Sequence, residues 1–479
     1  MKIPTLLVAI VWAFANQTIG LCSGPRACTD PRPNIVLIFI DDLGYHDIGC
    51  YGSTFYETPR LDALAKQSVR FTDFYSAHPV CSPTRAALMT GKAPQRVGIV
   101  DWIPQPSEIH LPHRENTIAE SLAAAGYDTG YIGKWHLGEK DDQLPTSHGF
   151  SWQRCVNRGG QPGSYYFPFE RVNRRKKNSS PTANFWDVPD LKGSDPNSYL
   201  TDRLTDQAIE YIGQKRDNPF FLCLSHYAVH TPIQPPKNRV EKYNAKAKLL
   251  PPDPEPVSEK HNSVSRSRQD NPNYAAMIEN LDTNVGRLLD ALQQGGQSQN
   301  TIVIFTSDNG GLTTKPKRVG PTSVVPLRAG KGWCYEGGIR VPCLIRWPAK
   351  LKPTVCQTPS ITMDLYPTLL DACGADPIPD QHLDGISLME TVQGKPVEER
   401  LLGWHYPKRH GSGHRPSTAI RVGQHKAIHF IESDKWELYD LANDRQEKHN
   451  LASTQPEMMD ALKARLNQWR EQTTTSSAK

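Results

Sequence analysis

The sequence predicts an α/β fold with a largely parallel central sheet, followed by a smaller C-terminal α+β subdomain with an antiparallel sheet. Three apolar runs support the parallel sheet, because strands buried on both faces are continuously apolar. They span residues 34–40, 220–224 and 301–306. Amphipathic helices are expected at 201–212 and 275–292. After about residue 384 short strand patterns replace the alternating strands and helices, which indicates a separate subdomain.

Length and charge limit the class of protein. The chain has 479 residues, 22% of them charged, and a formal net charge of +5. This length is sufficient for a large α/β domain and a smaller one. The charge balance excludes a disordered chain and a strongly basic nucleic-acid binder, so we expect no nucleic-acid partner. A mildly basic balance is compatible with an anionic substrate.

The first residues have the pattern of an export signal. A short basic start at Met1-Lys2 precedes an apolar run from Leu6 to Phe14 and small residues at Ser23-Gly24. We expect a signal peptide over residues 1–24 and an exported chain, periplasmic or secreted, or lysosomal or secretory if the host is eukaryotic. The apolar run is too short for a stable membrane span. Ten cysteines allow disulfides in such a chain, and they lack the CxxC spacing of a structural zinc site.

Local signals define further elements of the first half. Residues 69–75 have the composition of a single strand, and a capping-box pattern at 117–120 begins a helix. A strand expected at 127–132 leads into Lys134 and His136. Lys134 and His136 are two residues apart, so in an extended segment both side chains point to the same side.

Two polar stretches interrupt the second half. Residues 153–197 form an insertion rich in Gly, Pro and Asn, and residues 239–270 are expected to be a long surface excursion. A basic run at 174–177 gives the hypothesis that the insertion contacts a polyanionic substrate. The later elements are expected at 364–372 (helix), 419–422 and 427–431 (hairpin), 436–441 (strand) and after a cap at Thr454 (helix).

The stretch from Cys81 to Arg85 has the features of a helix start. Ser82 is a good N-cap and Pro83 suits the first helical position. Cys81 is then expected at the positive end of a helix beside Arg85, where an ionised thiol is favoured. Three interpretations remain at this point: a structural or disulfide-bonded cysteine, a cysteine-dependent phosphatase loop, and a C-x-P-x-R signature. Phosphatase loops place their arginine further from the cysteine than Arg85 lies here.

Polar residues follow four apolar strands. They are Asp41-Asp42, Lys134 with His136, His230, and Asp308-Asn309. In open α/β sheets ligands bind beyond the carboxyl ends of the strands, so we expect these residues to meet there. Asp41, Asp42, Asp308 and Asn309 are oxygen donors, which selects a hard cation over zinc. Ca²⁺ is expected, with Mg²⁺ as the alternative, because calcium accepts many oxygens in flexible geometry.

Taken together, these blocks resemble the type I (formylglycine-dependent) sulfatases of the alkaline phosphatase superfamily. The matching motifs are Asp41-Asp42, Cys81-Ser82-Pro83-Thr84-Arg85, Gly133-Lys134-Trp135-His136-Leu137-Gly138, Ser307-Asp308-Asn309-Gly310 and Gly330-Lys331-Gly332. The similarity covers nearly the whole chain after the signal, except residues 153–197 and 239–270, where no motif of the family aligns. One departure is Val229, where many relatives have proline before the histidine.

The resemblance implies an alkaline-phosphatase-like α/β/α sandwich with arylsulfatase-like activity on the sulfate ester of a glycan or small molecule. The catalytic domain would span residues 25–385 and the C-terminal subdomain residues 386–479. A formylglycine-generating enzyme would oxidise Cys81 to formylglycine (3-oxoalanine). The implied metal ligands are Asp41, Asp42, Asp308, Asn309 and the modified Cys81.

The same resemblance assigns the catalytic roles. Hydrated formylglycine would attack sulfur, and His136 would deprotonate its second hydroxyl to expel sulfate. Arg85 would stabilise the hydrated aldehyde. Lys134 and Lys331 would offset developing charge, and His230 with Lys331 would serve the leaving oxygen. Two other functions stay open: a phosphodiester or phosphonate ester hydrolase, and a non-catalytic binder of sulfated glycans in which Cys81 stays a thiol.

Overall fold

An eight-stranded sheet forms the centre of the protein in the computed structural model, which describes residues 32–171, 185–191, 193, 195–378, 381, 383–395 and 397–474. The strand order is β13-β2-β12-β9-β1-β6-β4-β5. Only β12 runs opposite to the others. The strands are β1 (Asn34–Ile40), β2 (Val69–Phe71), β4 (Asp128–Gly133), β5 (Trp152–Arg154), β6 (Phe220–Ser225), β9 (Thr301–Ser307), β12 (Cys343–Arg346) and β13 (Thr354–Cys356).

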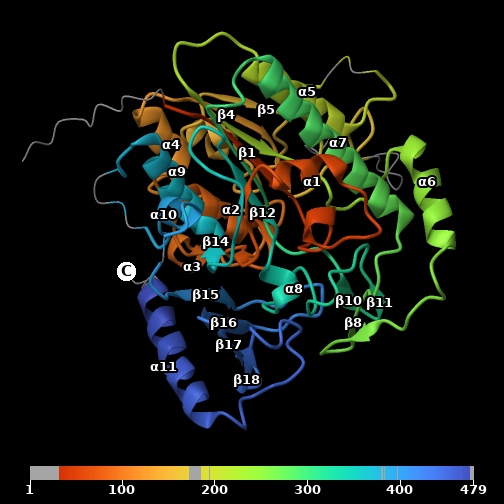
Figure 1. The fold of residues 1–479 in the computed structure, drawn as a ribbon, viewed down its shortest axis with the longest axis vertical. Helices are drawn as coiled ribbons and strands as arrows, with labels where there is room; N and C mark the ends of the chain where they lie inside the picture. The colour runs from red at the N-terminus through yellow and green to blue at the C-terminus, as the bar shows by residue number, and fades with distance from the viewer. Residues whose placement is uncertain are drawn as a thin grey trace, which may run out of the picture. The chain divides into compact units, whose positions relative to one another are not determined.

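Helices cover both faces of this sheet (Figure 1). Alternate residues of β1 point to opposite sides: Val36 and Ile38 pack with helices α5 and α7, whereas Ile35 and Leu37 pack with α2, α4 and α9. Burial on both faces explains why β1 is a continuous apolar run. The predicted α/β/α sandwich is therefore confirmed. The covering helices are α1 (Pro59–Ala65), α2 (Cys81–Thr90), α4 (Ile118–Ala124), α5 (Leu200–Ile212), α7 (Pro272–Gln294) and α9 (Leu365–Cys373), and α6 (Lys237–Lys248) packs on α7.

A second, antiparallel sheet follows near the C-terminus, as the sequence predicts. Its order is β15-β16-β17-β18, and helix α11 packs on it through Met459, Leu462 and Leu466. Figure 1 shows this sheet and α11 in blue. The strands are β15 (Leu401–Tyr406), β16 (Ser417–Val422), β17 (His425–Phe430) and β18 (Lys435–Asp440), and α11 spans Pro456–Thr473. The sequence did not predict β15.

Small elements complete the described chain. A four-stranded sheet consists of β7 (Val257–Ser258), β8 (Ser263–Ser265), β10 (Thr314–Pro316) and β11 (Arg318–Val319), and β3 (Phe74–Tyr75) pairs with β14 (Ser360–Ile361). The short helices are α3 (Pro94–Val97), α8 (Glu336–Ile339) and α10 (Met389–Val392). Four 3₁₀ turns lie at Gly49–Tyr51, Asp141–Gln143, Pro145–Ser147 and Thr362–Asp364.

Three expected elements are wrong in detail. Residues 239–270 lie at the surface as expected but have regular structure: α6 packs on α7 with Tyr243 buried, and β7 and β8 follow. Residues 69–75 form two strands in different sheets, β2 and β3. Gln455 occupies the N-cap position of α11, with Pro456 as its first residue, so Thr454 is not the cap. The polar composition of residues 239–270 concealed α6, in which only Tyr243 is fully buried.

Several predictions fall outside the described residues or stay untested. The signal peptide and the basic run at 174–177 lie outside them, and the domain limits remain a prediction. None of the described helices has the length and apolar composition needed to cross a bilayer. The eight cysteines within the described part of the chain, Cys223 among them, are free thiols.

Candidate active site

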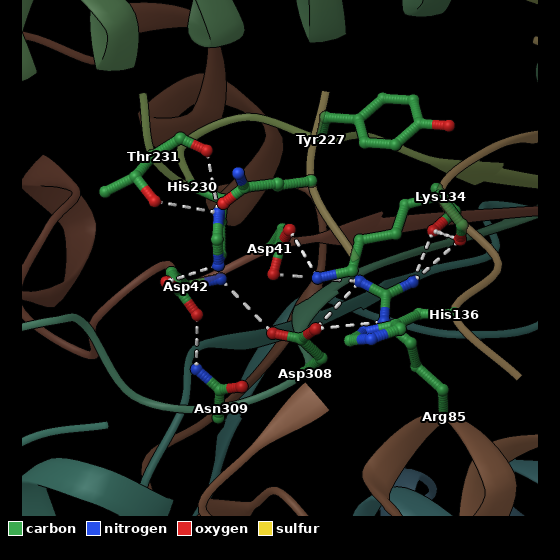
Figure 2. Close-up of polar contacts among 12 residues, drawn as sticks. Asp41, Asp42, Arg85, Lys134, His136, Tyr227, His230, Thr231, Asp308 and Asn309 are labelled. Carbon is green, nitrogen blue, oxygen red and sulfur yellow. Dashed lines mark hydrogen bonds and ion pairs between the residues drawn. The ribbon is translucent and has the colours of Figure 1, made fainter. Parts of the chain in front are cut away.

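The two acidic pairs meet where β1 and β9 end. Ile40 and Ser307 are register partners on these parallel neighbours, so Asp41-Asp42 and Asp308-Asn309 leave the sheet side by side. The backbone N–H of Asp42 donates to Asp308 Oδ1 over 3.2 Å, and Asn309 Nδ2 donates to Asp42 Oδ1 over 2.8 Å. Figure 2 shows the carboxylates pointing toward a common centre. The sequence prediction of a polar edge is correct for these four residues.

Each carboxylate has its own cationic partner from a distant part of the chain. Lys134 Nζ lies 2.6 Å from Asp41 Oδ2, and Lys331 Nζ lies 2.6 Å from Asp42 Oδ1. Arg85 donates to Asp308 Oδ2 from Nε (3.0 Å) and from its terminal nitrogen (2.7 Å). All these groups are buried or nearly so. Burial, together with Asp308 and Asp42, raises the pKa of Asp41, whereas Lys331 and His230 outweigh burial and lower the pKa of Asp42.

The oxygen atoms between these groups fit a cation. Asp41 Oδ1, Asp42 Oδ2 and Asn309 Oδ1 are buried and make no hydrogen bond within the described protein. Buried oxygens without partners are costly, and a cation would satisfy all three. Asp41 and Asp308 also offer oxygens that lie with the Cys81 sulfur in one group, all within 4.8 Å of one another. The site is therefore an acidic centre able to hold a metal ion, with Cys81 at its edge.

Cys81 is the first residue of α2, which corrects the expected cap. Val80 is the N-cap and makes no side-chain capping bond, so Pro83 is the third helical residue. Ser82 instead accepts the Ile103 backbone N–H on its hydroxyl over 3.1 Å. Burial raises the pKa of the Cys81 thiol, although Lys134 and Lys331 act in the opposite direction. Burial therefore opposes the ionised thiol that the helix start was expected to favour.

His136 is held in one tautomer. Its Nε2 lies 2.9 Å from the Ile103 carbonyl oxygen, and a carbonyl only accepts, so Nε2 carries the proton. Nδ1 is buried without a hydrogen-bond partner and keeps its lone pair. Burial, and then Lys134, lower the pKa of His136, so the ring is neutral.

The segment that carries Lys134 and His136 is not extended as predicted. His136 has φ 58° and Gly133 has φ 94°. A Cβ at Gly133 would lie 2.0 Å from the Ser225 carbonyl oxygen, so only glycine allows β4 to turn here beside β6. This turn brings both side chains to the site, by a route other than strand alternation.

His230 reaches the acidic centre from the loop after β6. Its Nδ1 lies 2.8 Å from the Thr231 carbonyl oxygen, and its Nε2 lies 3.6 Å from Asp42 Oδ2. Burial and Lys331 lower its pKa to about 3. With Val229 before it, the His230 imidazole still reaches Asp42.

A pocket of about 370 Å³ opens above these groups, with Cys81, His136, His230 and Lys331 at its base. The remaining lining residues are Trp102, Pro104, Gln105, Gly160, Gln161, Trp186 and His410. Sequence reasoning missed all seven, since they lie in loops that follow no periodic pattern. Gly160 and Trp186 belong to the 153–197 insertion, so its described part does border the site.

Comparison with known proteins identifies the family. The family described as "Sulfatase" matches residues 33–375, and the one described as "N-sulphoglucosamine sulphohydrolase, C-terminal" matches residues 329–472. The chain belongs to the sulfatase family. Arylsulfatase A of Homo sapiens is 33% identical over 476 residues, covering 90% of this sulfatase and 86% of that protein. N-acetylgalactosamine-6-sulfatase of Rattus norvegicus is 33% identical over 429 residues, covering 85% and 73%.

Solved structures agree on the fold. The crystal structure of Ps i-CgsB has a TM-score of 0.75 and 29% identity, covering 93% of this chain and 94% of that one. The same protein has been solved in complex with k-i-k-neocarrahexaose. Family, relatives and fold together make this chain a sulfatase of the alkaline phosphatase superfamily, an enzyme that hydrolyses sulfate esters.

Proposed function

We propose that this sulfatase works through formylglycine made from Cys81 and hydrolyses the ester of a sulfated carbohydrate or an aryl sulfate. The observation that carries the proposal is the position of Cys81. It is the first residue of α2, at the base of the pocket, with its sulfur grouped with oxygens of Asp41 and Asp308. A hydrated aldehyde there would supply the attacking hydroxyl. The protein's own contribution is the ring of charges around it.

Calcium is the proposed metal, held by Asp41, Asp42, Asp308, Asn309 and the modified Cys81. The proposed ligands from the protein are all oxygen atoms, and three of these buried oxygens have no hydrogen bond. Both facts support a hard cation, which would polarise the sulfate oxygens. Thermal unfolding of the protein with Ca²⁺, with Mg²⁺ and with a chelator tests this. Calcium should raise Tm most and chelation should lower it, because a ligand that binds only the folded state stabilises it. An unchanged Tm in all three would count against the site.

The remaining side chains have roles that follow from their charge and tautomer. His136, neutral with a lone pair on Nδ1, is the proposed base for the hydroxyl of residue 81. Arg85 fixes Asp308 and offsets charge beside residue 81, and Lys134 and Lys331 stabilise the sulfuryl group. The low pKa of His230 favours stabilisation of the leaving oxygen jointly with the Lys331 ammonium over proton donation by His230 alone.

Parallel kinetics separate this function from its alternatives. Rates on aryl sulfate, aryl phosphate and aryl phosphonate esters are compared on one preparation whose modification at Cys81 has been measured. The sulfate ester should have the highest kcat/KM. A higher value on a phosphorus ester would favour the phosphodiester or phosphonate hydrolase. If none of the three esters is hydrolysed and a sulfated glycan binds tightly, the result would favour a non-catalytic binder in which Cys81 stays a thiol.

Export and maturation complete the proposal. The pattern at residues 1–24 supports secretion, and conversion of Cys81 requires a formylglycine-generating enzyme as a partner during maturation. The Ps i-CgsB complex supports a glycan as the natural substrate, because that relative was solved in complex with k-i-k-neocarrahexaose.

A further inference from the structure

The walls of the pocket differ in chemistry from its base. The base carries Lys331, His136 and His230, whereas the walls present two indoles, Trp102 and Trp186. Among the described lining residues none is a carboxylate, and Lys331 is the one lysine or arginine. An anionic group therefore fits the base, and the walls suit a neutral body with an apolar face.

Trp102 carries an exposed side chain on a backbone that is held by hydrogen bonds. Its side chain is 42% exposed, which is unusual for so large an apolar group. Its backbone N–H donates to Asp101 Oδ1 over 2.8 Å, and the Tyr406 hydroxyl donates to the same oxygen over 2.9 Å. The next residue, Ile103, is bonded to both Ser82 and His136. A backbone held in this way loses little entropy when a ligand binds to the side chain that it carries.

Trp186 lies in the 153–197 insertion, where both its backbone and its ring make contacts. Its carbonyl accepts the Gly163 backbone N–H over 2.7 Å, and the Arg171 guanidinium lies 4.1 Å from its ring centroid. A Cβ at Gly159 would lie 2.8 Å from Trp186 Cδ1, so the glycine lets the chain approach the indole closely. The Trp186 ring therefore has a partner in Arg171, and the backbone that carries Trp102 is hydrogen-bonded, before any ligand binds.

We propose that Trp102 and Trp186 bind the sugar ring that carries the sulfate ester, and that this ring is a neutral pyranose. The C–H groups on one face of a pyranose match an indole, and the amides of Gln105 and Gln161 suit its hydroxyls. Among the described lining residues, no lysine or arginine other than Lys331 is present to balance the carboxylate of a sulfated uronate. A volume of about 370 Å³ suits one sulfated ring. The inference rests on the proposed function and adds the substrate class.

Binding measured without turnover tests the inference. In full-length Cys81→Ala protein, calorimetry gives Kd values for 6-sulfated galactose, 6-sulfated N-acetylgalactosamine, a sulfated glucuronate and inorganic sulfate. Trp102→Ala and Trp186→Ala are each expected to raise the Kd of the two sulfated sugars that lack a carboxylate, here called the neutral sugars, about tenfold. Stacking and burial contribute roughly that much. Inorganic sulfate, which needs only the base, should change less than about twofold. Trp102→Phe should restore most of the affinity.

Trp436→Ala, which removes a tryptophan of β18 outside the pocket, is the matched control and should leave every Kd unchanged. The proposal is overturned if the pocket variants bind the neutral sugars as the parent does, if sugar and sulfate weaken equally, or if the uronate binds best. It is also overturned if no neutral sugar binds. Absence of sulfate ester turnover by matured wild-type enzyme is a separate result, which would contradict the proposed function instead.

Discussion

At the residue scale, Asp41 and Asp42 are adjacent in the chain but have different partners. Asp41 faces Lys134 and Asp42 faces Lys331, so each carboxylate is balanced by a lysine from another loop. Their residue types were predictable, because carboxyl ends of parallel strands meet at one edge. Which lysine pairs with which aspartate was not predictable, because the lysines lie on loops and loops have no periodic sequence pattern.

Lys134→Ala and His136→Ala are expected to fold but to lose activity. Each removes one preorganised group from a buried site, which typically costs about 3 kcal/mol in the barrier, or on the order of 100- to 1,000-fold in kcat. Steady-state kinetics on an aryl sulfate, with circular dichroism for the fold, give the measurement. Lys140→Ala is the matched control, because Lys140 is an exposed lysine paired with Glu108 away from the pocket. Wild-type kcat in either site variant would contradict the assigned roles.

At the element scale, prediction succeeded where burial imposed a period. The apolar runs at 34–40 and 301–306 became β1 and β9 because both faces of the sheet are covered. Prediction failed where a single long-range contact determines the local structure. Ser82 has the composition of a cap, yet its hydroxyl binds the Ile103 N–H, a contact that depends on the tertiary fold.

Gly160→Ala tests the element that supports His136. A Cβ at Gly160 would lie 2.3 Å from His136 Cε1 and 2.5 Å from Nε2, so the ring must shift from the Ile103 carbonyl. We expect kcat to fall on the order of 100-fold, as for loss of an oriented catalytic group, with a normal fold. Gly411→Ala, where a Cβ would meet nothing within 4 Å, should behave as wild type. Equal kcat for both variants would show that the insertion does not position His136.

At the scale of the whole molecule, buried charges join the C-terminal sheet to the rest of the protein. Lys426 of β17 contacts Glu336 of α8 at 2.9 Å and Glu447 at 2.8 Å. Arg421 of β16 contacts Asp73, which follows β2, at 2.7 Å. No sequence pattern indicated this network. Removing one partner of a buried pair leaves an uncompensated charge, so the two sheets are expected to unfold together.

Buried neutral histidines predict a loss of stability in acid. Burial lowers the pKa of His226 from 6.5 to about 3, so the unfolded chain binds a proton that the folded protein does not. This contribution to the free energy of unfolding is present above pH 6.5 and is lost as the pH falls toward 3. At pH 4.5 the loss is about 2 to 3 kcal/mol.

His226→Gln should therefore flatten the dependence of unfolding free energy on pH between 6.5 and 4.5. Denaturant unfolding at several pH values gives the slope, which should decrease by about one proton. His449→Gln, at an exposed histidine, should keep the wild-type slope. Parallel curves for wild type and His226→Gln would contradict the account of His226.

The most direct test of the central claim is mass spectrometry of the peptide that carries Cys81, from active protein made in a host able to oxidise this cysteine. The account predicts the mass of an aldehyde at residue 81, at an occupancy that rises in proportion to kcat across preparations. Full activity in protein whose residue 81 is an unmodified thiol would contradict it.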